Sequence, residues 1–444
     1  MTSNSQQAGD RYVDFVVTEI QKAGDSLPGI IDAAEFAADL IVQKDGRLLA
    51  AGDDAFGMEQ IRRSAGFAFT KRYKPEKAGS SARFETSDEG LSVHQSAEFE
   101  KRFFVRDAEQ NDVALLGYEN EREEEAHLTE MIKQLHARKA FIVLFASKRA
   151  AGWVRSELGD VSNLVSITHD VPDGGVIEIP GWPEKVCSAR GLINRLYLWL
   201  FGAELIAAFL RRGKIPGILL SSTYESPQIW NLPLIDSYKF IPAFNVSPVR
   251  KGVFGQAYLK HLRDIAVSVV PDQRNNFRVA AQWLADAVRS RRTVRALTMG
   301  SLSPVGLAGN PDFFVNYTDP FTYDQDVKKI QSDEVALYAG YNWYPTALAE
   351  ALDRASAKLI LSITCVQDFP PTPLDLGEPF IQVSTLDDLP KHKNHVYIDS
   401  KFDQYDGCMT IPGYPIPGLP TSFLSVPLVY WHLVADTVEL LAKK

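Results

Sequence analysis

Acidic residues next to apolar segments are the first candidates for chemistry in this sequence. Glu225 lies in SSTYESPQIW, the segment that follows the apolar run GILL. Glu121 and the glutamates at 123–125 open the segment EREEEAHLTEMIKQLHARK. A carboxylate in a crevice can move a proton between adjacent carbons of a substrate, so Glu225 is a candidate base. The glutamate run has a simpler explanation, because acids at the start and bases at the end of a helix complement its dipole.

Hydroxyl groups follow a second apolar segment that ends in a glycine. Gly300 is followed by Ser301 and Ser303, whereas a similar turn at residues 52–54 carries two aspartates. Either serine can hold a hydroxyl or a phosphate of a ligand. Both turns also suit the start of a helix, with Asp54 or Ser303 as the N-cap.

The sequence lacks the common metal and nucleophile motifs. His392 and His395 stand three residues apart in a polar segment, with no carboxylate pair beside them. The cysteines at 187, 365 and 408 lie far apart without a CxxC pair. The chain has no P-loop, GxGxxG, GxSxG or HExxH sequence. The sequence therefore predicts no metal site and no cofactor, and it removes the usual support for nucleotide hydrolysis, Rossmann redox chemistry and zinc proteolysis.

The elements that must position these residues come in two similar sets. AAEFAAD at 33–39 recurs as AAQWLAD at 280–286, DVALLGY at 112–118 as EVALYAGY at 334–341, and IPGWP at 179–183 as IPGYP at 411–415. The glycine turns described above form a fourth match in the same order. This order predicts an internal duplication. The matching positions are Gly52 with Gly300, Val113 with Val335, and Ile179 with Ile411.

Each half of the sequence alternates between helical and strand patterns. Short apolar runs such as RLLAAG, VALLGY and FIVLFAS are typical of parallel strands covered on both faces. We therefore expect an α/β chain with two tandem three-layer α/β/α domains, at 1–212 and 253–444, joined by a connector at 213–252. The charged segment at about 71–110 predicts a surface insertion in the first domain. Ligands are expected at the carboxyl ends of the strands.

The segment GWPEKVCSARGLINRLYLWLFGAELIAAFL, which begins at Gly181, resembles the sugar isomerase (SIS) domain family. That family has a glycine turn after the first strand, a Ser/Thr-rich turn after a later one, and a G-P/T-E-x-x-V-A-S-T-K-like segment before a long apolar helix. Such three-layer α/β domains commonly bind phosphosugars and often occur in tandem, as in the isomerase part of glucosamine-6-phosphate synthase. The resemblance covers both halves. It implies Glu184 as a base, with a solvated loop carboxylate as the alternative, and Ser188 as a binding residue.

The Ser/Thr turn of the family is replaced in both halves. The first half has GYENEREEE, whose glutamates would oppose a phosphate dianion, and the second has GYNWYPTALAEAL. In the second, Pro345 suits a helix start and no carboxylate follows until Glu350, so the free amides of that helix can accept an anion. We therefore expect a bound phosphosugar near Ser301, Ser303, Asn342 and Thr346.

Composition limits the partners and the location of the protein. The chain has 444 residues and a formal net charge of −9, so it offers no global basic surface to a nucleic acid. The apolar stretches 192–210 and 424–441 contain polar and charged residues, which predicts buried helices that pair the domains and not membrane spans. The start, MTSNSQQAGD, lacks the features of a signal peptide, and a cytoplasmic location is expected. A homo-oligomer is left open.

Two functions remain open at this stage. The first is a sugar- or phosphosugar-binding protein with isomerase activity of the aldose–ketose type, which works by proton transfer. The second is a non-catalytic regulatory or structural protein that binds a sugar phosphate and has kept only the tandem fold. In both, the partner is a small sugar or sugar phosphate.

Overall fold

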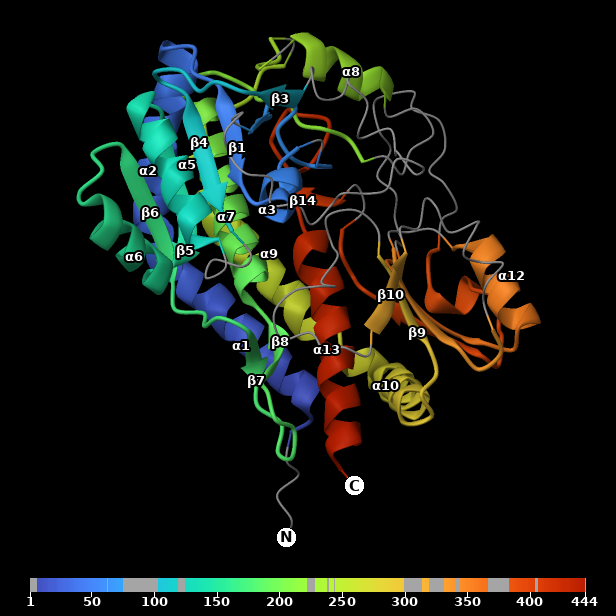
Figure 1. Ribbon diagram of the computed structural model, residues 1–444. Helices are drawn as coiled ribbons and strands as arrows, with labels where there is room; N and C mark the ends of the chain where they lie inside the picture. The colour runs from blue at the N-terminus through green and yellow to red at the C-terminus, as the bar shows by residue number, and fades with distance from the viewer. Residues whose placement is uncertain are drawn as a thin grey trace.

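The computed structural model describes residues 6–61, 63–74, 103–118, 124–221, 228–237, 239–242, 244–298, 314–318, 331–340, 344–365, 383–403 and 406–443. These residues form two parallel sheets with helices around them (Figure 1). The predicted α/β class with parallel sheets is confirmed. The first sheet has the order β3-β2-β1-β4-β5-β6 and the second has the order β10-β9-β11-β12-β13.

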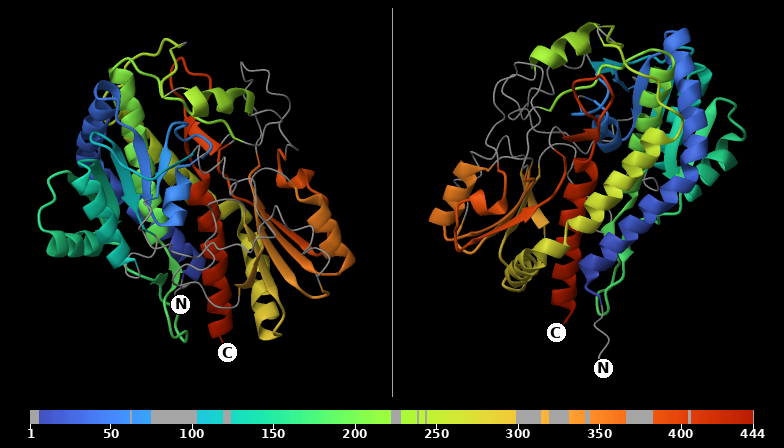
Figure 2. Two further views of the ribbon diagram at one scale, coloured as in Figure 1. Left: turned by 45° about the horizontal axis from the view of Figure 1, so that its top comes forward. Right: turned by 180° about the vertical axis from the view of Figure 1, so that it is seen from behind.

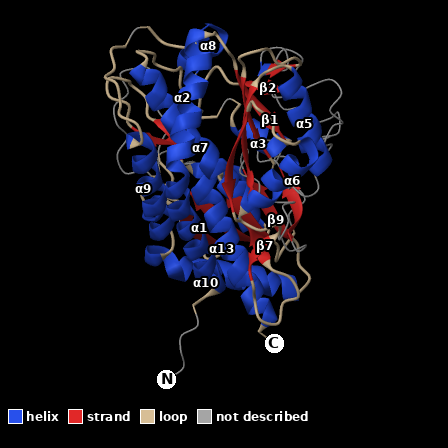
Figure 3. Ribbon diagram, turned by 90° about the vertical axis from the view of Figure 1, so that its left-hand side faces the viewer, coloured by secondary structure: helices blue, strands red, loops and turns tan. Residues whose placement is uncertain are grey.

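The first sheet lies between two layers of helices, as Figure 3 shows from the side. One face packs against α2 (Leu27–Gln43) and α7 (Arg190–Arg211), and the other packs against α5 (Glu125–Ala137) and α6 (Lys148–Leu158). Because both faces are covered, the central strands are buried along their whole length, which explains their unbroken apolar runs. The strands are β1 (Leu48–Gly52), β2 (Lys71–Tyr73), β3 (Phe104–Val105), β4 (Val113–Gly117), β5 (Phe141–Ser147) and β6 (Leu164–His169).

The second sheet repeats this arrangement with fewer elements among the described residues. Helix α10 (Arg274–Arg289) covers one face and α12 (Thr346–Arg354) covers the other. The first residue of β4 pairs with Leu48, and the first residue of β11 pairs with Val294 in the same parallel manner. Val113 and Val335 therefore occupy matching places. The strands are β9 (Val294–Thr298), β10 (Phe314–Thr318), β11 (Val335–Ala339), β12 (Lys358–Ile363) and β13 (His395–Asp399).

A short antiparallel hairpin follows each sheet, and the two hairpins share an unusual backbone. They are β7 (Gly175–Ile177) with β8 (Val186–Ser188), and β14 (Gly407–Met409) with β15 (Gly418–Pro420). The glycines of IPGWP and IPGYP have φ values of 84° and 83°, and Cys187 and Leu419 have φ values of 67° and 69°. Left-handed backbone is uncommon for cysteine or leucine, so Ile179 and Ile411 also belong to matching places. Gly300 lies outside the described residues.

Both predicted apolar helices are buried. Helices α7 and α13 (Ser422–Ala442) are long and apolar enough to cross a membrane by length and composition alone, but the most apolar window of each is 100% and 83% buried in the protein. They contact each other, and each also packs against a helix from the opposite half: α13 against α1 (Ala8–Ala23), and α7 against α9 (Val253–Ser268). Figure 2 shows α1, α9 and α13 side by side between the sheets. The helices thus join the halves as expected.

A buried carboxylate holds the start of α1 and of α9, the exchanged helices, which each pack against the long helix of the opposite half. Glu204 of α7 is fully buried, and its carboxylate accepts hydrogen bonds from the backbone N–H groups of Gly252 and Gly255 at 3.0 and 2.9 Å. Asp436 of α13 accepts from the N–H of Gly9 in the same way, at 2.8 Å. A negative charge at a helix N-terminus satisfies N–H groups that have no partner within the helix. The two halves therefore cap each other's first helix.

The predicted surface insertion at about 71–110 is wrong at both of its ends. Strand β2 pairs in parallel with β1, and β3 pairs in parallel with β2, so both belong to the first sheet. The charged residues of these strands are typical of a surface segment, so the sequence did not predict them as strands. Arg72 is nevertheless buried in spite of its charge. Residues 75–102, the middle of the expected insertion, lie outside the described residues. The connector contains a helix, α8 (Gln228–Ser237). The domain limits at 212 and 253 remain predictions.

We predict that Glu204→Gln lowers the free energy of unfolding by about 1–3 kcal/mol, because an amide leaves one of the two N–H groups at the start of α9 without an acceptor in a buried place. Chemical denaturation measures this change. The control is Glu157→Gln on the exposed surface of α6. Equal stability of the two variants would show that the Glu204 carboxylate does not cap α9.

Candidate functional site

The candidate site is the carboxyl edge of the first sheet, and it begins at the turn after β1. Asp53 accepts a hydrogen bond from the backbone N–H of Phe56 at 2.8 Å, and so it caps α3 (Asp54–Glu59). The cap expected at Asp54 from the sequence therefore lies one residue earlier, at Asp53. The reason is that the side chain at the end of the strand reaches the amide three residues later, while Asp54 is already helical.

The guanidinium of Arg72 packs over this turn and binds its backbone. Its Nη2 donates to the carbonyl oxygens of Gly52 and Asp53 at 2.7 and 3.0 Å, and Arg72 is only 3% exposed. A Cβ atom at Gly57 would lie against this guanidinium, so the glycine leaves the space that the Arg72 side chain occupies. Arg72 therefore fills the place where a glycine turn would otherwise offer open space to a ligand.

A buried polar chain crosses the same edge beneath α7. The side chain of Asn194 donates from Nδ2 to the carbonyl oxygen of Tyr118 at 2.8 Å, and its Oδ1 lies 2.8 Å from His169 Nε2. His169 Nδ1 accepts from the N–H of Val171 at 3.1 Å, so the proton of the ring must sit on Nε2. Burial lowers the pKa of His169 to about 4. This histidine is therefore neutral at neutral pH and orders the edge instead of carrying charge.

Charged side chains surround the start of α7 at this edge. Arg190 is 2% exposed and pairs with Asp173. Arg149 of α6 lies 3.3 Å from the same aspartate and 2.5 Å from Glu125 at the start of α5. Arg190 and Arg149 are thus both paired with acids of the chain itself.

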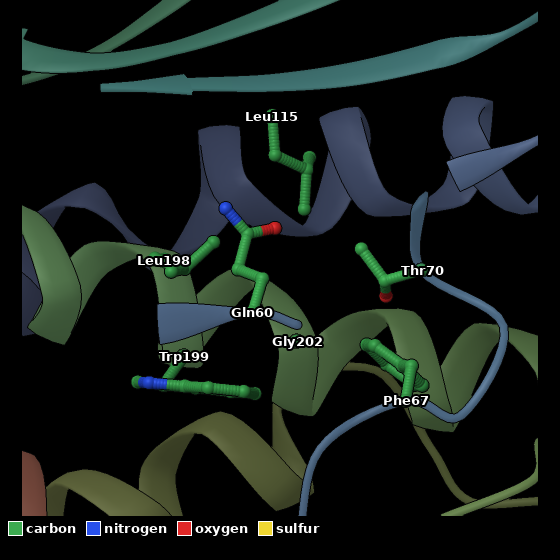
Figure 4. Close-up of a pocket in the computed structure, with 7 residues that line it drawn as sticks. All are labelled: Gln60, Phe67, Thr70, Leu115, Leu198, Trp199 and Gly202. Atoms are coloured by element: carbon green, nitrogen blue, oxygen red, sulfur yellow. The ribbon is translucent and has the colours of Figure 1, made fainter. Parts of the chain in front are cut away.

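A small cavity lies behind this edge, between β4 and α7 (Figure 4). It has a volume of about 10 Å³, room for about one water molecule, and is lined mainly by apolar side chains, with Gln60 and Thr70 as its polar members. Binding sites for small molecules are usually larger, at roughly 300–1,000 Å³. The cavity is therefore a packing void beside Trp199 rather than a place for a sugar.

Three of the predicted site residues lie within the described ranges. Glu184 is exposed on the turn between β7 and β8, which extends toward the chain ends (Figure 1). Ser188 is 7% exposed at the end of β8, and its carbonyl oxygen accepts from the hydroxyl of Tyr12 at 3.1 Å. Thr346 is exposed as the first residue of α12. Glu225, Ser301, Ser303 and Asn342 lie outside the described residues.

The structure does not bring these three residues to one place. Glu184 and Ser188 belong to a hairpin of the first half, whereas Thr346 starts a helix on the outer face of the second sheet (Figure 1). The sequence did not indicate Arg72, Asn194 or His169 as residues of this edge. Asn194 carried a signal, because an amide in the middle of a long apolar helix needs a partner when it is buried. No pattern in the sequence indicated which residues would be the partners of Asn194.

The matching edge of the second sheet is described only in part. Asp399 ends β13, and its Oδ1 accepts from the N–H groups of Cys365 and Lys401 at 3.0 and 2.9 Å. Burial raises the pKa of Asp399 above its ordinary value, and these hydrogen bonds act in the opposite direction. The carboxylate thus joins the ends of β12 and β13 and fixes the floor of this edge.

No family model matches the chain, and no curated protein matches it. Among solved structures, the chain is similar to the C-terminal domain of glucosamine-fructose-6-phosphate aminotransferase from Francisella tularensis, with 9% identity over 99% of this chain and 96% of that one and a TM-score of 0.47. A candidate sugar-binding protein from Salmonella typhimurium has 10% identity over 95% and 99%, with a TM-score of 0.43. A candidate phosphosugar isomerase from Bacillus subtilis has 10% identity over 95% and 94%, with a TM-score of 0.40.

These structures are of the kind that the sequence resembles. What the chain can bind has to follow from its own residues.

We predict that the stability of the protein falls as the pH drops from about 7 to 5, in part through His169. The pKa of this group is lowered in the folded state from 6.5 to about 4, so between these values the unfolded chain binds the proton more readily. The stability it contributes is present above pH 6.5 and is lost as the pH falls toward 4, by about 2 kcal/mol between pH 7 and 5.

Denaturation of His169→Gln at both pH values measures this contribution, since the variant should lose less stability than the wild type on acidification. His136→Gln, on the exposed surface of α5, is the control and should keep the wild-type dependence. An unchanged pH dependence in His169→Gln would contradict a neutral, buried His169.

Proposed function

We propose that this chain is a sugar- or phosphosugar-binding protein, with isomerase activity of the aldose–ketose type by proton transfer as its catalytic form. The main support is that both halves end their parallel strands at an edge built of polar groups, followed by a long helix in the segment that resembles the SIS family. Ligands of open parallel sheets bind at this edge. The duplication of the halves and a location in the cytoplasm are parts of this proposal.

The second half is the better place for a phosphate. Helix α12 has no acidic residue in its first turn and no side-chain cap, and its first residue, Thr346, is exposed. Helix α5, its counterpart, begins with Glu125, which is paired with Arg149. The N–H of Thr346 donates to the carbonyl oxygen of Tyr344 at 2.9 Å, but the next N–H groups of the first turn and the helix dipole favour an anion at α12. Ser301, Ser303 and Asn342 are proposed to complete this site with Thr346, and Ser188 is proposed to serve the first half.

The proposed bases are Glu184 and Glu225. The exposed position of Glu184 on a hairpin turn gives a base no shelter from water, so Glu225 is the stronger of the two. A second function, binding without catalysis, is favoured by the way Arg72 and Asn194 occupy the first edge with bonds to the chain itself. We propose no nucleic acid and no membrane as partners. A homo-oligomer is compatible with either function.

Incubation with hexose, hexosamine and heptose phosphates in deuterated water distinguishes the two functions. Solvent deuterium in the recovered sugar, detected by NMR, shows proton transfer and supports the isomerase. A rise in melting temperature with a phosphosugar, without any exchange, supports the binding protein. Neither exchange nor a stability change with any of these sugars would refute the proposal as a whole.

We also predict that Asn342→Asp weakens phosphosugar binding by ~1–3 kcal/mol, because it adds a negative charge beside the anion. Calorimetric titration measures the affinity, and Glu121→Gln in the first half serves as the matched change of charge. A strong effect of Glu121→Gln together with an unchanged Asn342→Asp would place the ligand in the first half instead.

A further inference from the structure

The amino edge of the second sheet brings together a carboxylate and two histidines. Asp353 comes from the last turn of α12, His392 from the loop before β13, and His395 is the first residue of β13. One potential ligand atom from each lies within 4.8 Å of the other two. The carboxylate that is missing beside the histidines in the sequence is thus supplied by a helix about forty residues earlier in the chain.

The spacing of these groups suits a common ligand better than it suits direct pairing. His392 Nδ1 lies 3.5 Å from Asp353 Oδ2, and the two imidazole rings lie with their centroids 4.4 Å apart. Hydrogen bonds between nitrogen and oxygen are shorter, at roughly 2.7–3.2 Å. A tetrahedral zinc ion, with bonds of about 2.0–2.1 Å, separates its ligand atoms by roughly 3.3 Å.

The protonation of His395 is set by its neighbour. The hydroxyl of Tyr397 donates its proton to the carbonyl oxygen of Pro390, so it accepts at 3.2 Å from His395 Nδ1. The lone pair of the ring is therefore on Nε2. This atom is buried and has no hydrogen-bond partner in the described part of the chain, in a residue that is only 7% exposed.

We propose that Asp353, His392 and His395 bind a zinc ion. Two neutral imidazoles and a carboxylate are ligands that zinc accepts, and a tetrahedral site with three protein ligands takes water as its fourth. Tyr397 plays the part of the outer partner that orients a ligating histidine. Because the site lies at the amino edge, away from the strand ends where a substrate would bind, the ion is structural and ties α12 to β13.

A second group of potential ligands, His261, Asp403 and Cys408, is a weaker candidate. His261 Nε2 and Asp403 Oδ2 already form a hydrogen bond of 2.7 Å, so each satisfies the other. Burial raises the pKa of the Cys408 thiol well above its ordinary value, and zinc binds the thiolate. This group serves as the internal control for the proposal.

The test is calorimetric titration of the metal-stripped full chain with Zn²⁺, together with its melting temperature. We expect one ion per chain, a higher melting temperature with Zn²⁺, and an affinity at least tenfold weaker in both Asp353→Asn and His392→Ala. These two side chains are 45% and 32% exposed, so the variants should keep the fold. His261→Gln should bind Zn²⁺ like the wild type.

Cobalt provides a second measurement on the same proteins. Co²⁺ at this site should give the visible bands of a tetrahedral ion without the near-ultraviolet band of a thiolate ligand. A thiolate band that disappears in Cys408→Ser would place the ion at the other group and overturn the proposal. The absence of Zn²⁺ binding by the wild type, or wild-type affinity in both Asp353→Asn and His392→Ala, would overturn it as well.

Discussion

Two long apolar helices have to be covered on every side, and this need shapes the whole molecule. In the described part of the chain, each long helix is covered in part by a helix of the opposite half. Helix α1 of the first half packs against α13 of the second half, and α9 of the second half packs against α7 of the first half. As a result, one continuous apolar cluster runs through both halves and includes residues of both sheets. The apolar area removed from water in this way is the largest favourable contribution that the fold can draw on.

Such burial brings polar groups into the interior, and those that join the two halves or line the first carboxyl edge each have a particular partner. Glu204 and Asp436 accept from the starts of the exchanged helices. Asn194 joins Tyr118 to His169, and Arg72 covers the turn after β1. A buried polar group without a partner costs free energy, whereas a satisfied one specifies a single arrangement. The described polar groups at the first carboxyl edge therefore order that edge, which limits what they can offer to a ligand.

Much of the fold could be predicted from the sequence, because its strands and helices follow from repeated local patterns. Unbroken apolar runs marked the strands, and the IPG segments marked hairpins whose backbones agree at Gly181 and Gly413. Strands β2 and β3 were not predicted, because their charged residues are typical of a surface segment. The site was harder to predict, because its contacts join residues far apart in the chain. Asn194 and His169, or Asp353 and His395, come from different elements, and no local pattern says that they meet.

The exchange of first helices also determines how the chain comes apart. With α1 completing the core of the second half and α9 that of the first, neither half can lose its structure while the other keeps its own. Unfolding should therefore be one cooperative transition of the whole chain and not two separate ones. The connector is itself packed against the first half, since Ile218 is fully buried and pairs with Phe67. If it were cut, the two pieces would hold together only as a pair, and each piece alone would expose a long apolar helix to water and aggregate.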